Sequence, residues 1–390
     1  MQTKAALPIL FVVMFLVMVG FGIIIPVLPF YAEEIGASPT ELGLLMAVYS
    51  FMQLIFAPMW GRLSDRIGRK PVMMIGITGL ALSFYIQAIS TELWMLFAAR
   101  IIGGTLSSAN MPTAMAYVAD ITTEENRGKG MGIVGAAVGL GFVFGPAIGG
   151  IFSKISLSMP FYLASGSSLI TLILVFLLLK ESKLNKNDSI KKRGSIWGAF
   201  NRDVGVLFFV QLLISLSLSG LEATFAYFAA KKAGLNSTEL GYIFMIMGFV
   251  GAMVQGGLVG RMTKKYGEPP VIQVGIIVSA LGFGLILLVN SFTTAAIFLS
   301  IFGIGNGVIR PSVSSLLTKT STAGHGSATG LLSSFDSLGR IIGPPLGGWL
   351  FSLAIGLPYI SGVIISMAAL VLFFLFRPQV STVKSTNMQN

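Results

Sequence analysis

The sequence predicts an all-α polytopic membrane protein with twelve transmembrane helices in two pseudo-symmetric six-helix bundles. Of its 390 residues, 54% are hydrophobic and 11% are charged, whereas a soluble domain needs roughly a quarter of its residues charged. Charge-free stretches cover 5–32, 42–61, 130–153 and 155–179, and each is long enough for a helix to cross the hydrocarbon core, which takes about 20 residues. A third observation, an internal repeat, divides the spans into two equal sets. The composition excludes an ordinary soluble enzyme.

Polar loops that carry most of the charged residues separate the predicted spans. The first apolar run exceeds a typical signal h-region and lacks a plain small-residue cleavage site, so we predict an uncleaved first helix. The longest polar segment follows the sixth span and predicts a cytoplasmic linker at 180–204. This linker separates an N-terminal six-helix bundle (1–179) from a C-terminal one (205–378), and a cytoplasmic tail follows (379–390). The expected spans are 7–30, 42–60, 72–90, 93–119, 131–152, 159–179, 205–229, 239–259, 271–289, 294–318, 328–352 and 357–376.

The two halves repeat the same glycine and proline spacing. The pattern G-x8-G-x3-G-P-x2-G-G occurs at 132–150 and again at 330–348, an offset of 198 residues. An offset of 199 relates the glycines and arginine of 61–68 to those of 260–267, and relates Pro112 to Pro311. Several matches at a nearly constant offset indicate a duplicated six-helix unit. Small residues spaced by four also predict close helix packing around the fifth and eleventh spans, and Pro146 predicts a bendable helix.

Basic residues gather on one side of the predicted topology. With a cytoplasmic N-terminus, 20 of the 26 Lys and Arg residues fall in inside loops, three fall outside and three lie within spans. This bias places both termini in the cytoplasm and the chain in a cell membrane. The net charge of +11 therefore reflects topology, and a nucleic-acid partner is not expected.

The residue inventory limits the available chemistry. The chain has no cysteine and a single histidine, His325, so disulfides, thiolate nucleophiles and an imidazole metal site are not expected. The glycines and lysine of 61–70 lack the order of a phosphate-binding loop. We expect no metal, no cofactor and no enzymatic activity, and any proton transfer must rest on carboxylates.

Five charged residues fall inside predicted spans: Arg100, Glu222, Arg310, Asp336 and Arg340. Each costs about 2.5–3.5 kcal/mol at a helix centre, so each should face the interior. Asp336 and Arg340 are four residues apart and can neutralise each other, which competes with a coupling role. Glu222 has no such partner on its own helix, which favours binding of a proton or a cation, with Arg310 as a possible counter-ion.

Four motifs together are similar to those of a known family. They are GRLSDRIGRKP (61–71), Arg100-x3-Gly104, the glycine run of 132–150 and the GIIIPVLP stretch of 22–29. On these motifs the chain resembles the major facilitator superfamily, specifically its drug:proton antiporter branch, over essentially its whole length. The resemblance implies a monomeric bacterial inner-membrane or plasma-membrane transporter. It would alternate access to a central site and export small lipophilic molecules against proton entry, with the proton gradient as its energy source.

The resemblance also assigns roles to residues. Proton coupling is expected to involve Glu222, Asp336, Arg310, Arg340 and Arg100, although structural bracing explains Arg100 equally well. Asp65 is expected to form a conformational latch with Arg127 or Asp120, and the second copy has Lys264 in its place, so the latch should be asymmetric. The bend of the fifth span is expected to seal the central cavity. The expected conformational residues are Gly61, Asp65, Arg66, Gly68, Arg69, Asp120, Arg127, Gly141, Gly145, Pro146, Gly149, Gly343 and Pro344.

Substrate contacts are expected from polar and aromatic residues near mid-span, each of which is also compatible with helix packing. The closest pattern is the Gram-positive multidrug branch, which shares Glu222 and Arg310 but can carry an acid where Gly307 stands. Interior charge sums to three positive and two negative, or +1, so neutral and zwitterionic substrates stay open beside lipophilic cations. The expected contacts are Tyr49, Gln53, Asn110, Glu222, Phe225, Gln255, Asn306 and Arg310.

Two other functions remain open from the sequence. The first is export of a specific metabolite such as a sugar, a peptide or a siderophore. The second is a membrane sensor or scaffold that binds a ligand without moving it; the linker is too short for a recognisable signalling domain, which weakens this reading.

Overall fold

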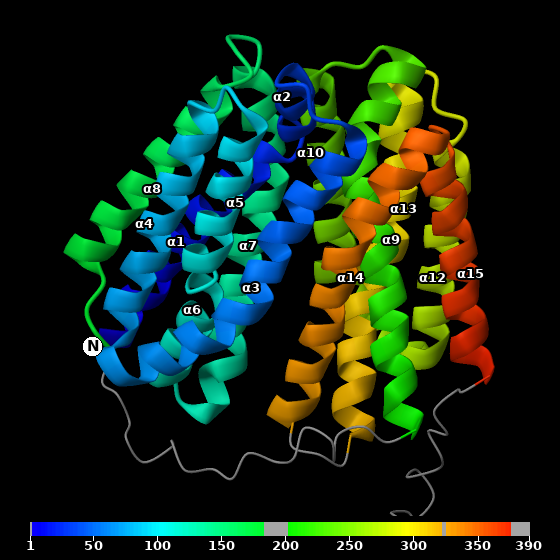
Figure 1. The fold of residues 1–390 in the computed structure, drawn as a ribbon. Helices are drawn as coiled ribbons and strands as arrows, with labels where there is room; N and C mark the ends of the chain where they lie inside the picture. The colour runs from blue at the N-terminus through cyan, green and yellow to red at the C-terminus, as the bar shows by residue number, and fades with distance from the viewer. Residues whose placement is uncertain (1, 183–201, 322–324, 376–390) are drawn as a thin grey trace, which may run out of the picture.

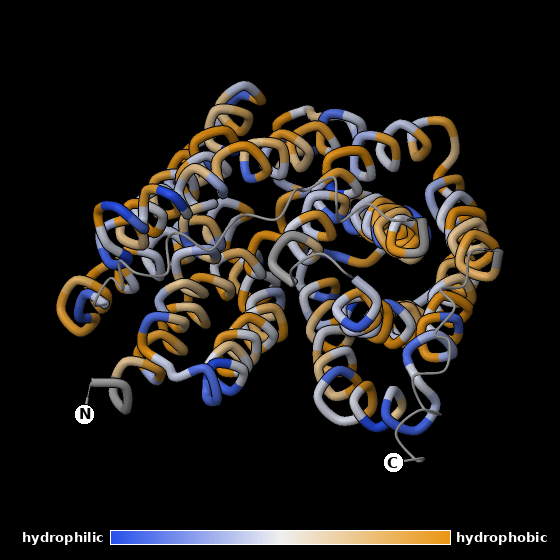
Figure 2. The backbone as a smooth tube through the Cα atoms, turned by 90° about the horizontal axis from the view of Figure 1, so that it is seen from below, coloured by the Kyte–Doolittle hydropathy of each residue, from blue (hydrophilic) through white to orange (hydrophobic). Residues whose placement is uncertain are grey.

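The structure is a computed structural model and describes residues 2–182, 202–321 and 325–375. Most of the predicted linker (180–204) and the whole predicted tail (379–390) lie outside the described residues. Within the described ranges, all regular secondary structure is helical. Figure 1 shows the helices of the first half on one side and those of the second half on the other, and Figure 2 shows the same two groups from below.

Each of the six predicted spans of the first half is helical. The fourth span is divided between α5 and α6, and the short helix α2 follows α1 after a break at 25–27. The elements are α1 (Gln2–Ile24), α2 (Leu28–Glu34), α3 (Pro39–Ile67), α4 (Arg69–Ala88), α5 (Leu93–Ser107), α6 (Asn110–Ile121), α7 (Glu124–Phe152) and α8 (Met159–Leu178).

The second half repeats this order. Its eighth span is composite, because a π-helical turn joins α10 to α11. The elements are α9 (Arg202–Ala233), α10 (Ser237–Met253), η3 (Val254–Val259), α11 (Gly260–Tyr266), α12 (Glu268–Ile286), α13 (Phe292–Thr320), α14 (His325–Leu353) and α15 (Leu357–Leu375).

Ten helical segments in the described ranges are long and apolar enough to cross a membrane. The fourth span is absent from this set because α5 and α6 are separately too short, at 15 and 12 residues. The eleventh span is the second one absent from this set. It corresponds to α14, which is 29 residues long and carries Asp336 and Arg340. Both exceptions occupy positions that the repeat assigns to spans, so they are consistent with twelve crossings.

The sequence did not predict the break in the fourth span. Pro112 explains it, because a proline ring clashes with the carbonyl group four residues earlier, here that of Ser108. Near the break, neighbouring side chains donate hydrogen bonds to the backbone carbonyl oxygen of Thr105. The Trp60 Nε1 donates to the Thr105 carbonyl oxygen at 2.6 Å, and the Ser108 hydroxyl donates to the same oxygen at 2.8 Å.

The glycine repeat packs each half in the same way. On α7, a Cβ at Gly141 would lie 2.5 Å from the Met18 Cβ and one at Gly145 would lie 2.6 Å from the Gly22 Cα, both on α1. On α14, a Cβ at Gly339 would lie 2.7 Å from the Ser215 Cβ on α9. These separations exclude any side chain, so the repeated glycines let α7 approach α1, and α14 approach α9, backbone to backbone.

A second face of the same motif contacts the opposite half. A Cβ at Gly241 on α10 would lie 2.5 Å from the Pro146 carbonyl oxygen on α7. A Cβ at Gly348 on α14 would collide with the Pro39 carbonyl oxygen on α3. Hydrogen bonds also cross between the halves, from the Thr238 hydroxyl to the Gly150 carbonyl oxygen at 2.6 Å. All these contacts lie at the end of the molecule that carries α2 (Figure 1).

Toward the opposite ends of α3, α7, α14 and the segment formed by α10 and η3, the described glycines lack such contacts with the other half, and we call this the open end. Glycines there have no heavy atom within 4 Å of an added Cβ, at Gly61 on α3, Gly132 on α7, Gly256 on η3 and Gly330 on α14. The described parts of the two halves therefore make their close contacts at the α2 end.

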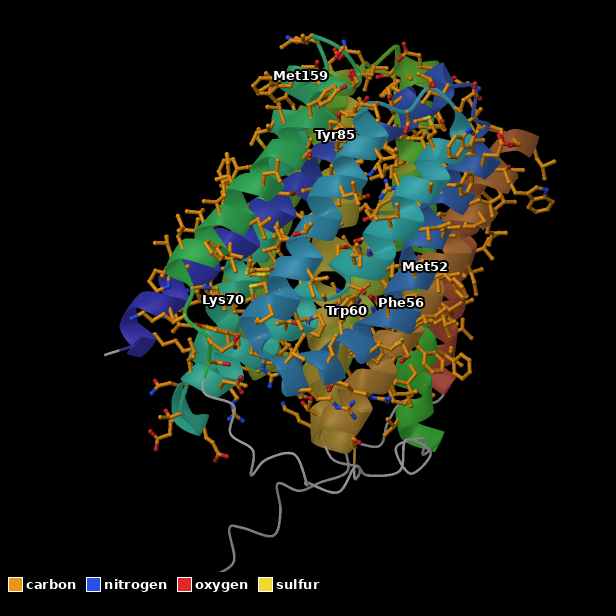
Figure 3. The ribbon with its side chains drawn as sticks, turned by 60° about the vertical axis from the view of Figure 1, so that its left-hand side comes forward. Met52, Phe56, Trp60, Lys70, Tyr85 and Met159 are labelled. Atoms are coloured by element: carbon orange, nitrogen blue, oxygen red, sulfur yellow. The ribbon has the colours of Figure 1, made fainter. Side chains whose placement is uncertain are left out.

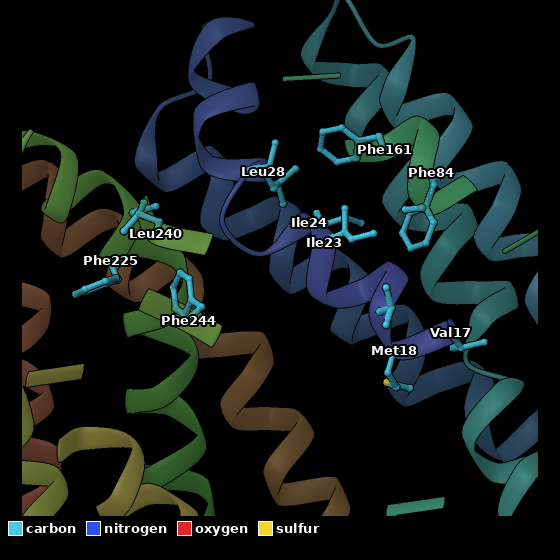
Figure 4. Packing of buried hydrophobic residues seen from close by; sticks show 14 of the residues in the cluster. Val17, Met18, Ile23, Ile24, Leu28, Phe84, Phe161, Phe225, Leu240 and Phe244 are labelled. Carbon is cyan, nitrogen blue, oxygen red and sulfur yellow. The ribbon is translucent and has the colours of Figure 1, made fainter. Parts of the chain in front are cut away.

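One apolar core continues across both halves at this closed end. Ile24 and Leu28 lie between Phe84 and Phe161 of the first half and Phe244 of the second (Figure 4). A separate cluster, which includes Leu207, Ile276 and Leu317, belongs to the second half alone. The continuous core adds apolar contact to the backbone contacts that close the α2 end.

We expect Gly149→Ala to destabilise the protein by about 1–3 kcal/mol, the usual cost of overpacking. Its Cβ would collide with the Ile23 carbonyl oxygen of α1. Gly139→Ala on the same helix is the matched control, because an added Cβ there meets nothing within 4 Å, and alanine favours a helix by about 1 kcal/mol. Thermal unfolding of purified protein in detergent measures both. Equal midpoints would contradict the close approach of α7 and α1.

Candidate functional site

The second half brings three of the five predicted interior charges together at Asp336. The side chain of Asp336 is 11% exposed, and its Oδ2 lies 3.3 Å from the Arg340 Nε and 3.7 Å from an Arg310 terminal nitrogen. The Gln211 side-chain amide donates to its Oδ1 at 2.8 Å, and the Ser215 hydroxyl donates to the same oxygen. Helices α9, α13 and α14 thus all supply contacts to the Asp336 carboxylate, which forms ion pairs with two arginines.

Glu222 lies on α9 near the same cluster but differs from Asp336 in its contacts. Arg340 and Asp336 are the charged groups that act on it electrostatically. Within the described ranges, no hydrogen bond or ion pair to a protein group is recorded for its carboxylate. A role of Glu222 in binding a proton or a ligand stays a prediction.

The first half holds the fifth interior charge. Arg100 on α5 is 9% exposed, and its guanidinium carbon lies 5.6 Å from the centre of the Tyr49 ring on α3. The Tyr49 hydroxyl is within hydrogen-bond distance of the Ser107 hydroxyl at 2.7 Å and accepts from the Gln53 amide at 3.3 Å. This brings the predicted residues Tyr49, Gln53 and Arg100 together.

The cation–π contact compensates only part of what Arg100 costs. Such a contact contributes about 0.5–2 kcal/mol, against about 2.5–3.5 kcal/mol for an arginine at the centre of a membrane helix. Among the residues that the structure describes, none accepts a hydrogen bond from the buried Arg100 Nε, and no acid pairs with the guanidinium. By contrast, Arg310 and Arg340 both have Asp336.

The other predicted substrate contacts are dispersed in this conformation. Asn110 is 2% exposed beside Gly76, and within the described part of the chain neither polar atom of its amide has a hydrogen-bond partner. Phe225 is fully buried and packs edge to face on Phe244 at 5.8 Å, so it lies in the core and not on an open surface. Gln255 is exposed on η3, and Asn306 is half-buried on α13. Their roles in substrate binding stay predictions.

The loop between α3 and α4 forms an ion-pair network centred on Arg69. Its Nε donates to Asp120 at 2.8 Å, and one terminal nitrogen donates to Asp65 at 2.6 Å and to the Ser64 hydroxyl at 2.7 Å. Asp65 thus reaches Asp120 through Arg69, and no ion pair joins it to Arg127 in this conformation. The Arg127 Nε is buried without a partner among the described residues, and Arg66 is exposed. A latch formed by Asp65 stays a prediction.

Glu181, at the start of the predicted linker, caps the N-terminus of α4. Its carboxylate accepts hydrogen bonds from the backbone N–H of Arg69 at 2.7 Å and from that of Lys70 at 3.3 Å. The helix dipole stabilises a negative charge at this position. Gly68 has φ +106, and an added Cβ there would lie 2.6 Å from the Glu181 carboxylate. The Lys70 Nζ, marked in Figure 3, donates to the Phe176 carbonyl oxygen of α8 at 2.7 Å.

The second half carries the same network with the signs reversed. The offset of 199 places Lys264, Glu268 and Lys319 at the positions of Asp65, Arg69 and Asp120. Glu268 forms an ion pair with Lys319 and accepts from the Ser315 hydroxyl at 2.9 Å. The second copy thus retains one of the two ion pairs of the first, with inverted charge. Inspection of charges at the repeat offset could have found it.

Sequence reasoning missed the α9 partners of Asp336, although a signal was present. Gln211, Ser215, Ser219 and Glu222 recur at helical spacing along α9 and form a polar stripe on one face. Glu181 had no such signal, because a cap supplied from 112 residues away depends on the packing of α8 beside α4. No group of three or more His, Cys, Asp or Glu residues that could hold a metal ion occurs in the described ranges.

Comparisons with known proteins agree with this architecture. A family model described as Major Facilitator Superfamily matches residues 10–262 and 207–389. Multidrug resistance protein 1 of Bacillus subtilis (strain 168) is 32% identical over 363 residues, covering 92% of both chains. The quinolone resistance protein NorA of Staphylococcus aureus (strain MSSA476) is 28% identical over 386 residues, covering 97% of this chain and 98% of NorA.

A solved structure of similar fold is a bacterial homologue of the human lysosomal transporter Spinster in an inward-facing, occupied conformation. It superposes with a TM-score of 0.80 at 15% identity and covers 96% of this chain and 97% of its own. With two six-helix halves, a matching family model and relatives that span nearly the whole chain, the protein belongs to the Major Facilitator Superfamily.

Proposed function

We propose that the chain is a proton-coupled exporter of lipophilic drugs that works as a monomer by alternating access. The observation that carries the proposal is the contrast between the two acids of the second half. Asp336 is held by two arginines and two polar side chains, whereas Glu222 makes no hydrogen bond or ion pair with any residue that the structure describes. Glu222 can therefore exchange a proton for a substrate without dismantling the cluster.

The distribution of basic residues supports a direction of transport. Among the described residues, Arg66, Lys129 and Lys264 lie at the helix ends that form the open end, whereas Lys232 at the end of α9 and Lys154 just after α7 lie at the α2 end. The positive-inside rule then makes the open end cytoplasmic, with both termini on that side. The conformation described here would load substrate from the cytoplasm.

In the proposed cycle, Glu222 releases its proton to the cytoplasm and admits substrate. After the halves rock about the site, an external proton neutralises Glu222 and displaces the substrate. One inward charge through 100 mV supplies about 2.3 kcal/mol, before any pH gradient is added. The names of the relatives, a multidrug resistance protein and a quinolone resistance protein, support a drug substrate.

The test is efflux of rhodamine 123, a fluorescent lipophilic cation, from proteoliposomes under an imposed pH gradient. We expect gradient-driven efflux by the parent and its loss in Glu222→Gln, because the neutral amide cannot release a proton. Glu92→Gln, at an exposed position before α5, is the matched control and should transport like the parent. If Glu222→Gln is monodisperse and still binds the dye, its loss of transport reflects lost proton coupling and not misfolding.

Other results would redirect the assignment. Unaffected transport by Glu222→Gln would move the coupling role to Asp336. A parent that moves no cationic, zwitterionic or neutral dye would favour export of a specific metabolite. Binding of dye without any transport would favour a sensor.

A further inference from the structure

A groove lies between α1 and α8 near the open end of the first half. It has a volume of about 210 Å³ and is lined by Pro8, Ile9, Val12, Leu174 and Leu178. The two α8 residues are four apart, as are Pro8 and Val12 on α1, so each pair lies on one face of its helix. All five side chains are apolar, and the groove is therefore suited to a hydrocarbon ligand.

The second half closes the equivalent position with its own side chains. The offset of 198 residues places Val206, Leu207 and Val210 of α9 at the positions of the three α1 residues. All three are buried in an apolar cluster that includes Phe373 of α15, whereas Val12 is 43% exposed. The repeated helix pair can thus be packed shut, so the groove is not a necessary consequence of the fold.

Two lysines lie beside the last turn of α8, which forms one end of the groove. Lys180 is exposed two residues beyond Leu178, and the Tyr117 hydroxyl donates to its carbonyl oxygen at 2.7 Å. The Lys70 Nζ donates to the Phe176 carbonyl oxygen in that turn at 2.7 Å (Figure 3). Among the described residues, neither lysine forms an ion pair. An ammonium group has three N–H donors, so both lysines can still bind an external anion.

The neighbouring acids are already engaged by other groups. Asp65 and Asp120 form ion pairs with Arg69. The Glu181 carboxylate accepts hydrogen bonds from the backbone N–H groups of Arg69 and Lys70 at the start of α4. An anion at the end of the groove therefore meets the two ammonium groups without displacing an existing ion pair.

The face of α8 beside the groove is turned away from the rest of the first half. Ile173, Phe176 and Leu177 are exposed apolar residues of this helix, and in a chain that spans a membrane such a face contacts lipid. Basic sites between membrane helices on the cytoplasmic side bind anionic lipid headgroups. A ligand with a hydrocarbon chain and a phosphate matches both parts of the site and can reach it from the bilayer.

We propose that one anionic phospholipid of the cytoplasmic leaflet binds here, with an acyl chain in the groove and its phosphate on Lys70 and Lys180. The cytoplasmic assignment follows the positive-inside rule, as it does in the proposed function. The inference goes beyond that function, because a protein that transports nothing could still bind this lipid. The bound lipid joins the end of α8 to the starts of α1 and α4, within one half.

The experiment measures lipid binding to the purified full-length protein by native mass spectrometry. The probes are phosphatidylglycerol, which is anionic, and phosphatidylcholine, which is zwitterionic, with identical acyl chains. We expect the first phosphatidylglycerol to bind the parent more tightly than the first phosphatidylcholine. In the double variant Lys70→Gln/Lys180→Gln, the Kd for phosphatidylglycerol should rise by about tenfold or more, and the Kd for phosphatidylcholine should change little.

Matched variants separate this site from general attraction to a basic surface. Lys264→Gln/Lys265→Gln removes two exposed lysines at the same end of the second half and should leave the Kd for the first phosphatidylglycerol unchanged. Val12→Phe fills the groove and should weaken the binding of both lipids. Val371→Phe, at an exposed position on α15, is the control for that change and should bind both lipids like the parent.

A further variant guards against a folding defect. The Lys180 side chain is exposed and makes no recorded contact with a described residue, so Lys180→Glu should keep the unfolding temperature of the parent in lipid-free detergent. The same change should raise the Kd for phosphatidylglycerol, because it places a carboxylate beside the phosphate.

Three results would overturn the proposal. Equal effects of the two double lysine variants would show attraction to the basic surface as a whole. Equal Kd values for the two lipids in the parent, or Val12→Phe binding lipid like Val371→Phe, would exclude recognition by the headgroup or by the groove. Displacement of phosphatidylglycerol by glycerol phosphate, which has no acyl chain, at a similar concentration would assign the lysines to a soluble phosphate.

Discussion

A disulfide between Ser153→Cys and Ser237→Cys is expected to abolish transport until it is reduced. The two hydroxyl oxygens lie 2.8 Å apart, one at the end of α7 and the other at the start of α10, so short cysteine side chains can come within the S–S bond length of about 2 Å. The bond would hold the halves together at the α2 end. Because alternating access requires this end to open, the locked protein should bind substrate but not release it across the membrane.

The measurement is dye efflux from proteoliposomes after mild oxidation and again after dithiothreitol. The chain has no native cysteine, so background cross-linking is absent. Each single cysteine variant serves as the matched control and should transport under both conditions. A second lock, Thr40→Cys with Ser352→Cys, joins α3 to α14, where the native oxygens lie 3.4 Å apart. Full transport by either cross-linked protein would show that its contact need not open.

Asp336→Ala is expected to destabilise the protein by about 3 kcal/mol and to lower the yield of folded protein. Removing one partner from a buried pair costs about 3–5 kcal/mol. The lower end applies here because the side chains of Arg340 and Arg310 are 40% and 60% exposed, which lets water screen them. The change also removes the acceptor of the Gln211 and Ser215 hydrogen bonds. Thermal unfolding in detergent measures the loss.

Two comparisons separate a structural role of Asp336 from a coupling role. Asp336→Asn keeps the shape and an acceptor for Gln211 but loses the charge, so its stability should be intermediate. Combining Asp336→Ala with Arg340→Ala should cost less than the sum of the single changes, with a coupling energy of about 0.5–3 kcal/mol. Transport lost at unchanged unfolding temperature would instead make Asp336 a coupling acid.

Most of the fold could be predicted because its determinants are local. Charge-free runs long enough to cross a bilayer located the spans, and the repeated glycines at an offset of 198 identified two equivalent halves. Two of the deviations from continuous spans follow from local chemistry. Pro112 breaks the fourth span near Ser108, and the glycine-containing stretch Val254–Val259 adopts a π-helical turn.

The site was predictable only in part. Intramembrane charge identified all five residues, and the i,i+4 spacing predicted the pair of Asp336 and Arg340, which the structure contains. Arg310 joins Asp336, while Glu222 and Arg100 make no ion pair with a described residue. This outcome depends on how α5, α9 and α13 are rotated against their neighbours. Spacing along one helix carries no information about that rotation.

By itself, the sequence determined the membrane class, the twelve spans, the duplication and the positions of the interior charges, because hydropathy, proline geometry and side-chain charge act within a few turns of one helix. Only the tertiary structure decided which acid is clamped, which arginine lacks a partner, which end is closed and how Glu181 caps α4. Those outcomes arise from contacts between segments up to 312 residues apart, as between Thr40 and Ser352. Such contacts depend on the packing of whole helices. Glycine faces such as those of α7 and α14 determine which helix can approach closely, and the side-chain contacts follow from that packing.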